Sequence, residues 1–344
     1  MNAADWRPVT APAALDVRGD SALSASPAKA RAQSAPVLAV TTGEASSGAP
    51  RRWHSAIRVR HVAVVAALLI YPFVASPFFT FQIAGQALVL GIIALSLTFL
   101  AGSGGMVSLA QMTVAGVAGY LVAIFGSSAS PISLHWPWWL AVPLAILVAT
   151  AFATFVGWLA VRTEGIYTIM ITLAIGAAFY FFTNQNYALF NGHTGMNSIE
   201  TPVFWGVDWR ASLPFYYLTL GLATLCYFAI DYLGRAPFGL ALQGVRDNPR
   251  RMAALGFHVN AHRIAAYTFA AFLAALGGIL QVWNYKQISP GSVGVDGAIN
   301  ILIIAAVGGI TRPVGPFIGA FIFVLLRTFA IDFLREIGLD GNRF

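Results

Sequence analysis

The sequence predicts an all-α protein that crosses a membrane several times. Of its 344 residues, 58% are hydrophobic and only 10% are charged, and long apolar runs follow one another from Val62 onward. A soluble domain carries about 25% charged residues, so this chain has too little charge to cover a water-exposed surface. Helices are favoured over barrel strands because the runs are continuously apolar and do not alternate.

The remaining composition argues against nucleic-acid binding and against a metal site. The net charge is +7, but there are only two lysines, and no clustered basic face is interleaved with aromatic residues. The single cysteine, Cys226, cannot form an internal disulfide or a cysteine-based metal site. His258 and His262 stand four residues apart, a spacing that is here more typical of a solvated helix face than of a metal site.

Residues 1–60 are predicted to form a cytoplasmic tail. The first fifty are rich in Ala, Ser and Pro, their charges cancel and they show no apolar period, so we expect them to be disordered. A secretory signal is excluded because the first long apolar run starts only at Val62, and an amphipathic targeting peptide is the alternative. Residues 61–344 then form the membrane domain.

The membrane domain contains nine apolar runs that suit spanning or re-entrant helices. A span needs about 20 mostly apolar residues. The runs are 62–80, 83–101, 108–126, 138–161, 165–183, 213–233, 264–283, 298–311 and 314–334. The eighth run is short, which favours a re-entrant or broken helix.

The basic residues between the runs predict that the N-terminus is cytoplasmic. With that orientation, eleven arginines fall in cytoplasmic segments and four basic residues fall in outer segments. This asymmetry is what the positive-inside rule requires. Nine spans place the C-terminus outside.

The long cytoplasmic loop, residues 234–263, contains signals for a short helix. Asn248 can cap its N-terminus, Pro249 suits the first helical position, and Gly256 can adopt the left-handed conformation that ends a helix. A two-turn helix over 249–255 is not stable alone in water. Its apolar residues therefore predict a partner with a groove, and the alternative is that the helix packs back onto its own membrane domain.

This loop resembles the coupling loop of ABC importer permeases, in the version found in branched-chain amino acid permeases of the LivM type. The matching residues are Phe238, Gly239, Ala241, Leu242, Arg246, Asp247, Ala253, Ala254, Leu255 and Gly256, with Met252 in place of the usual acidic residue. The resemblance implies that cytoplasmic ATPases contact Arg246, Asp247, Asn248, Pro249, Met252, Ala253, Ala254, Leu255 and Gly256.

Residues 102–120, 162–176 and 308–320 are similar to further motifs of the same family, and the resemblance covers about 85–334. The glycines Gly102, Gly104 and Gly105 are expected to break a helix, and irregular backbone within a membrane must be buried or line a cavity. We expect a substrate path formed by Gly102, Gly104, Gly105, Ser108, Gln111, Thr113 and Thr172. The alternative for the polar side chains is that they only form helix–helix hydrogen bonds.

Three charged residues and two glycines lie in or near the other predicted spans. Asp231 and Asp332 fall near predicted helix ends, whereas Arg327 lies deeper and no partner for it could be named. Gly315 and Gly319 favour a close helix-packing face. The outer loop, residues 184–212, suits either docking of a binding protein or a solvated loop.

The resemblance implies a permease subunit of an ABC importer for branched-chain or related amino acids in the bacterial inner membrane. Two ATPase subunits carrying ATP and Mg²⁺, a homologous second permease and a solute-binding protein are the implied partners. The chain itself has no phosphate-binding G-x-x-x-x-G-K-[ST] motif, so we expect no catalytic residue and no bound cofactor.

Two alternatives remain open: a permease for urea, a sugar or another small polar solute, and an ion-coupled secondary transporter. Members of the family continue beyond a segment like 341–344, so we expect that the chain lacks a final helix.

Overall fold

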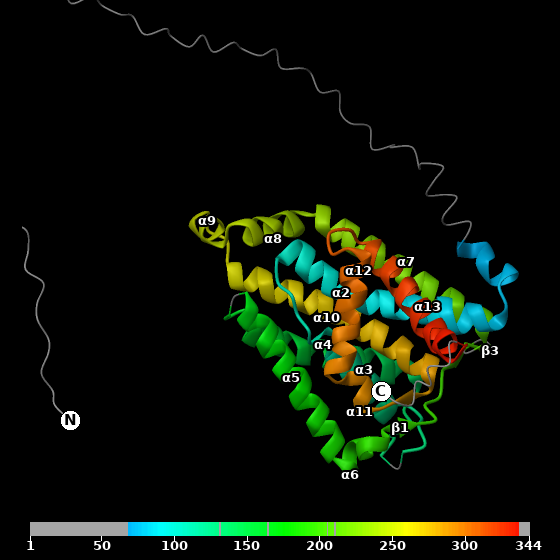
Figure 1. The fold of residues 1–344 in the computed structure, drawn as a ribbon. Helices are drawn as coiled ribbons and strands as arrows, with labels where there is room; N and C mark the ends of the chain where they lie inside the picture. The colour runs from blue at the N-terminus through cyan, green and yellow to red at the C-terminus, as the bar shows by residue number, and fades with distance from the viewer. Residues whose placement is uncertain (1–67, 131, 164, 205, 210, 337–344) are drawn as a thin grey trace, which may run out of the picture. The chain divides into compact units, whose positions relative to one another are not determined.

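The computed structural model describes residues 68–130, 132–163, 165–204, 206–209 and 211–336 (Figure 1). The predicted tail, the start of the first predicted span and the C-terminal residues 337–344 lie outside this part of the chain.

The described part is built almost entirely of helices, which confirms the all-α prediction. After a helical stretch at residues 68–74, the chain forms the π-helix η1 (Phe79–Gly85) and the α-helices α2 (Gln86–Gly104), α3 (Gln111–Phe125), α4 (Trp138–Ala160), α5 (Ile166–Gln185), α6 (Tyr187–Phe190), α7 (Ser212–Arg235), α8 (Pro237–Asp247), α9 (Pro249–Ala254), α10 (Val259–Tyr285), α11 (Pro290–Val293), α12 (Val295–Gly308) and α13 (Gly315–Glu336). A 3₁₀-helix, η2 (Gly192–Thr194), follows α6.

Four two-residue strands complete the described secondary structure. Strand β1 (Met196–Asn197) pairs antiparallel with β4 (Gln287–Ile288), and β2 (Val203–Phe204) pairs antiparallel with β3 (Val207–Asp208). The first pair joins the predicted outer loop to the segment that follows α10.

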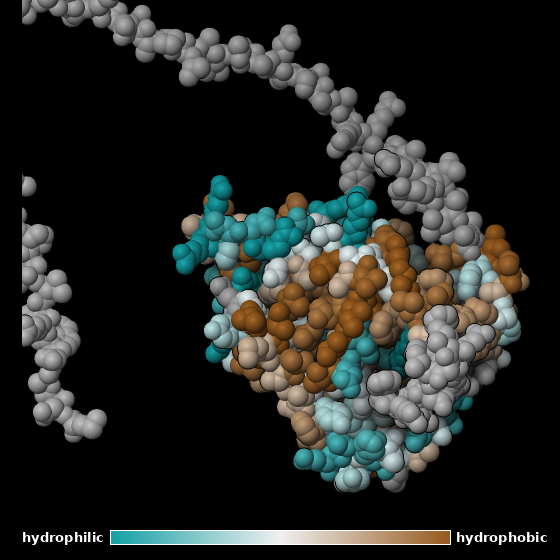
Figure 2. Space-filling view, viewed as in Figure 1, coloured by the Kyte–Doolittle hydropathy of each residue, from teal (hydrophilic) through white to brown (hydrophobic). Residues whose placement is uncertain are grey.

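Five helices within the described residues are long and apolar enough to cross a membrane. They are Phe79–Gly104, Trp138–Ala160, Ile166–Gln185, Ser212–Arg235 and Val259–Tyr285, and three shorter apolar helices lie at 111–125, 295–308 and 315–330. Figure 2 shows a belt of apolar side chains across the middle of one face, between polar side chains over α8 and α9 and those at the end where α6 lies. The multi-pass membrane class is therefore confirmed, while the number of nine spans stays a prediction.

The predicted boundary between the first two spans is wrong. No loop occurs at residues 81–82, because η1 and α2 form one continuous helix from Phe79 to Gly104. The interruption lies at Ala75 and Ser76 instead. Pro77 follows directly, and a proline disfavours helical backbone at the preceding residue.

The predicted loop 234–263 is also more helical than expected. Besides the short helix, it contains α8, and α10 begins at Val259 rather than near residue 264. Pro237 takes the first helical position of α8, where its missing N–H costs nothing. Gly239, Leu242 and Val245 then recur at a spacing of three, and all three are buried. This period was visible in the sequence.

Helix α2 lies in the interior of the bundle and is buried along most of its length. It packs against α7, α10, α12 and α13. The predicted close approach at Gly315 and Gly319 is confirmed. The backbone of Gly319 touches the backbone of Ile304 and Gly308, so α12 and α13 meet without intervening side chains.

Candidate functional site

The short helix predicted in the long loop exists as α9, and its end signals act as expected. The side-chain oxygen of Asn248 accepts the Arg251 backbone N–H at 2.9 Å, and Pro249 takes the first helical position. Gly256 has φ +89°, a conformation that strains other residues. The predicted range of 249–255 differs from α9 by one residue at the C-terminal end.

Helix α9 exposes most of its apolar side chains. None of its residues is buried, Ala253 and Ala254 are exposed, and Leu255, just beyond its end, is 67% exposed. Met252 is half-buried and packs on α8: a methyl group added at Gly244 would lie 2.8 Å from its sulfur. In Figure 1 the helix lies at the edge of the fold, beyond α8. Met252 therefore faces the chain itself, and Leu255 does not.

Arg246 connects α8 to the predicted helix break. Its guanidinium donates a hydrogen bond to the carbonyl oxygen of Gly102, in the last turn of α2. The aliphatic part of the same side chain covers Gly105 so closely that any Cβ there would overlap it. Arg246 also forms an exposed ion pair with Asp247 at 3.0 Å. We call α8 and α9 the coupling segment.

The predicted helix break is confirmed at Gly105, whereas Gly102 and Gly104 belong to the last turn of α2. Helix α2 ends at Gly104, and Gly105 is left-handed with φ +65°. The segment up to α3 has no regular structure, but its residues Met106, Ser108 and Leu109 are buried. This is the setting in which irregular backbone is tolerated within a membrane.

The predicted path side chains are packed inside the protein. Ser108, Gln111, Thr113 and Thr172 are at most 2% exposed. The Thr172 hydroxyl accepts the Leu109 N–H at 3.2 Å, and the Ser96 hydroxyl donates to the Gln111 side-chain oxygen at 3.2 Å.

Thr113 marks a close approach between α3 and α5. A methyl group added at Gly176 would lie 2.9 Å from its hydroxyl oxygen. In this structure these polar groups therefore join α2, α3 and α5, and their contact with solute stays a prediction.

A cavity of about 440 Å³ lies elsewhere, at the end of α10 opposite to the coupling segment. We call it the outer pocket. Six helices and β4 line it, and its polar or charged side chains are Gln86, Gln281, Tyr285, Gln287, Ser289, Ser292, Asp296, Asn300 and Arg327. Its volume falls within the roughly 300–1,000 Å³ that is usual for small-molecule sites.

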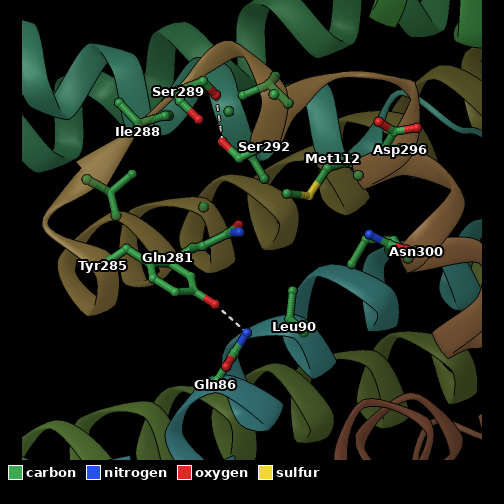
Figure 3. Close-up of a pocket in the computed structure, with 18 of the residues that line it drawn as sticks. Gln86, Leu90, Met112, Gln281, Tyr285, Ile288, Ser289, Ser292, Asp296 and Asn300 are labelled. Atoms are coloured by element: carbon green, nitrogen blue, oxygen red, sulfur yellow. Dashed lines mark hydrogen bonds between the residues drawn. The ribbon is translucent and has the colours of Figure 1, made fainter. Parts of the chain in front are cut away.

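The side chains of the outer pocket converge on a common space. Figure 3 shows Gln281 and Tyr285 from α10, Gln86 from α2, and Asn300 from α12 around it. The Gln86 amide donates a hydrogen bond to the Tyr285 hydroxyl and so joins α2 to α10. On the rim, the Ser292 hydroxyl donates to the Ser289 carbonyl at 2.7 Å.

Sequence reasoning missed this pocket. It singled out Arg327 as a charge deep in a predicted span, and the structure places Arg327 in the pocket wall. The isolated amides Gln86 and Gln281 inside apolar runs were a further signal, because polar groups at membrane depth are costly and face cavities or partners. Asp296, just before the short eighth run, was not considered.

The predicted outer loop is attached to the pocket wall. Met196 of β1 pairs with Ile288 of β4, and Asn197 pairs with Gln287. Both residues of β4 line the outer pocket. Two residues of the loop are thus paired directly with residues that line the pocket.

The other polar residues singled out from the sequence lie near helix ends. Asp231 forms an exposed ion pair with Arg235 at 2.9 Å in the last turns of α7, while the Asp332 side chain lies outside the described residues. His262 stacks on Phe238 with ring centroids 5.8 Å apart, and its ring Nδ1 lies 3.0 Å from the His258 carbonyl oxygen. Within the described residues no three His, Cys, Asp or Glu side chains form a group that could hold a metal ion.

Curated proteins similar to this chain are permeases. Over 298 residues it is 24% identical to the high-affinity branched-chain amino acid transport system permease protein LivM of Escherichia coli, covering 79% of this chain and 68% of that protein. It is 24% identical over 218 residues to the protein of the same name from Salmonella typhimurium, covering 57% of this chain and 51% of that protein. It is 23% identical over 189 residues to the probable branched-chain amino acid transport permease protein LivM of Methanocaldococcus jannaschii, covering 54% of each chain.

The chain thus spans about half the length of two of these relatives and about two thirds of the third. No solved structure matches it. The family model matches residues 79–337. This range includes the helical membrane bundle, the helix break at Gly105 and the exposed helix α9. The chain belongs to the family described as branched-chain amino acid transport system / permease component.

Proposed function

We propose that this chain is the permease subunit of an ATP-driven importer for branched-chain or related amino acids. The observation that carries the proposal is α9, a capped two-turn helix that holds Ala253, Ala254 and Leu255 in solvent. A helix this short is not stable alone, and an exposed apolar helix face fits a groove on a partner. Membership of the family and the names of the relatives support the amino-acid solute.

In this proposal separate cytoplasmic subunits bind ATP and Mg²⁺ and hydrolyse the nucleotide. Their closure displaces the coupling segment, and Arg246 transmits the displacement to the end of α2 through its contacts with Gly102 and Gly105. A homologous second permease completes the solute path, and a solute-binding protein delivers solute at the end that carries the outer loop. The complex lies in the bacterial inner membrane.

Transport by the complex, purified with its native partners and placed in lipid vesicles, tests this function. We expect leucine uptake that requires ATP and the binding protein, because closure of the ATPases supplies the driving force. Uptake driven by an ion gradient without ATP would contradict the proposal and favour a secondary transporter. Calorimetric titration of the binding protein with leucine, ribose and urea identifies the solute class, and binding of ribose or urea alone would contradict an amino-acid substrate.

The variant Leu255→Arg tests the docking of α9. Placing an unpaired charge in a desolvated contact costs several kcal/mol, so we expect the ATPases to be lost on purification and uptake to fall at least about tenfold, while membrane insertion is unchanged. Ala261→Arg adds the same charge at an exposed position in the first turn of α10 and serves as the control. Normal ATPase recovery with Leu255→Arg would refute the role of α9.

A further inference from the structure

The outer pocket carries two charges of opposite sign on neighbouring helices. Asp296 belongs to α12 and Arg327 to α13, and both line the pocket. The ion pairs of the described residues are Arg235 with Asp231 and Arg246 with Asp247, so neither pocket charge is neutralised by an ion pair there. Both side chains are exposed in this chain.

Arg327 stands at a depth where an unneutralised charge needs a reason. It lies twelve residues beyond the first residue of α13, which is about 18 Å along the helix. Charged residues in the apolar helices of a membrane protein are costly, so they face a water-filled cavity or a partner. The pocket supplies the cavity, and the polar side chain of Tyr285 lines it as well.

Asp296 is the acidic residue of the pocket wall. It lies in the first turn of α12, where the partial positive charge of the helix N-terminus favours a negative side chain. This helix end alone does not define a ligand site. The site is defined by the cavity, which the carboxylate shares with a guanidinium and with the Asn300 and Gln281 amides.

Part of the wall is apolar. Leu90, Met112, Ile288, Ile301 and Phe323 line the same cavity. Two opposite charges beside a patch of aliphatic and aromatic side chains match the parts of one kind of solute: a zwitterion with an apolar side chain. A neutral sugar or urea would leave both charges without a counter-charge, and the desolvation of such groups is costly.

We propose that the outer pocket binds the zwitterion of an apolar amino acid. Arg327 receives the carboxylate, Asp296 receives the ammonium group, and the side chain of the solute lies on the wall that contains Leu90, Met112 and Phe323. The inference rests on the proposed function, because it locates the amino acid on the path of that importer. The fork of the guanidinium suits a planar carboxylate.

A thiol placed in the pocket tests the proposal in the complete transporter complex. The natural cysteine, Cys226, is buried in α7 and is replaced with Cys226→Ser. Ser292→Cys then puts one thiol on the pocket rim, and its labelling rate by a small thiol reagent is measured. Three probes are compared: leucine, leucinol, which lacks the carboxylate, and 4-methylpentanoate, which lacks the ammonium group.

We expect leucine to slow the labelling at concentrations about 10- to 100-fold lower than either analogue, the range for loss of one charged hydrogen bond. Arg327→Gln should remove the advantage of leucine over leucinol but not over 4-methylpentanoate, and Asp296→Asn should do the reverse. Arg235→Gln and Asp231→Asn, which break an exposed ion pair far along the chain in α7, should keep both preferences.

Several results overturn the proposal. Equal protection by the three probes does so without any charge variant, so a misfolded Arg327→Gln leaves the test intact. Protection by ribose equal to that by leucine also overturns it. So does a thiol that reacts in the isolated chain but not in the complex, because the second permease then fills the pocket.

Parallel measurement of uptake separates this inference from the function. ATP-driven leucine uptake without protection of the thiol refutes the pocket alone. Leucine protection without ATP-driven uptake refutes the importer mechanism and supports the pocket.

Discussion

Arg246 offers the sharpest test of how the coupling segment acts on the membrane helices. Replacing it with methionine, Arg246→Met, keeps an unbranched apolar stem over Gly105 and removes the guanidinium. Two polar contacts are lost: the hydrogen bond to the Gly102 carbonyl and the ion pair with Asp247. The variant therefore breaks the link between α8 and α2 while preserving the packing.

The structure sets the size of the effect. The side chains of the Arg246–Asp247 pair are 41% and 66% exposed, and exposed pairs contribute between about 0 and 1 kcal/mol. A hydrogen bond from a charged group contributes about 1.5–3 kcal/mol when buried, and we discount this for the exposure of Arg246 to about 1 kcal/mol. That amount changes an equilibrium between two states about fivefold.

The ratio of solute transported to ATP hydrolysed is the measurement that isolates this link. We expect the ratio to fall about fivefold in vesicles that contain the Arg246→Met complex, with normal recovery of the ATPases. Arg235→Met, at an exposed arginine whose ion pair lies within α7, is the matched control. An unchanged ratio in Arg246→Met would show that the displacement reaches α2 by another route.

Two further predictions concern helix packing and coupling. Gly319→Ala should lower the stability of the detergent-solubilised protein by about 1–3 kcal/mol, because its Cβ would overlap the backbone of Ile304 and Gly308, whereas Gly221→Ala, with nothing within 4 Å, should leave stability unchanged or raise it; thermal unfolding of both decides, and equal stability would disprove the close contact. Arg246→Met and Tyr285→Phe, which act at the two ends of α2, should not affect uptake independently. Residues coupled through one element deviate from additivity by about 0.5 kcal/mol or more, so the double variant should differ more than about twofold from the product of the two single effects. A double variant whose uptake equals that product would mean that the two ends of α2 act independently.

Helix α9 was predictable because its signals are local. The cap from Asn248, the proline at the first helical position and the left-handed Gly256 all lie within residues 248–256, at the two ends of the helix itself. Such signals are read directly from the sequence. Helix α8 was missed although its buried residues recur at every third position. The many arginines of residues 234–263 favoured a loop over a helix in the sequence-based prediction.

The outer pocket was not predictable in the same way. Its wall draws on side chains from Gln86 to Arg327, and their convergence depends on how six helices pack. The sequence shows that Arg327 is unusual but not which residues lie opposite. The same limit applies to Gln111 and Thr172: their polarity is visible in the sequence, whereas their hydrogen bonds to Ser96 and to the Leu109 backbone are not.

Helix α2 relates the two regions physically. Gln86 at its start bonds to Tyr285 in the wall of the outer pocket, and the Gly102 carbonyl near its end accepts the bond from Arg246. Sixteen residues separate the two positions, about 24 Å along a helix. A helix that is buried along most of its length in close-packed surroundings cannot compress, so a displacement at the Gly102 end reaches Gln86 as a tilt or rotation of the whole element.

The glycine run then has a mechanical role. The chain beyond Gly105 is irregular up to α3, so the end of α2 can move without dragging α3 as a continuous rod. At the other end, Phe317 of α13 packs directly on Gly91 of α2, so a tilt of α2 also bears on the helix that carries Arg327. Coupling between the two regions requires an element with two positions. The contacts identify α2 as that element, and they place one charge of the pocket on α13, a helix that packs against it.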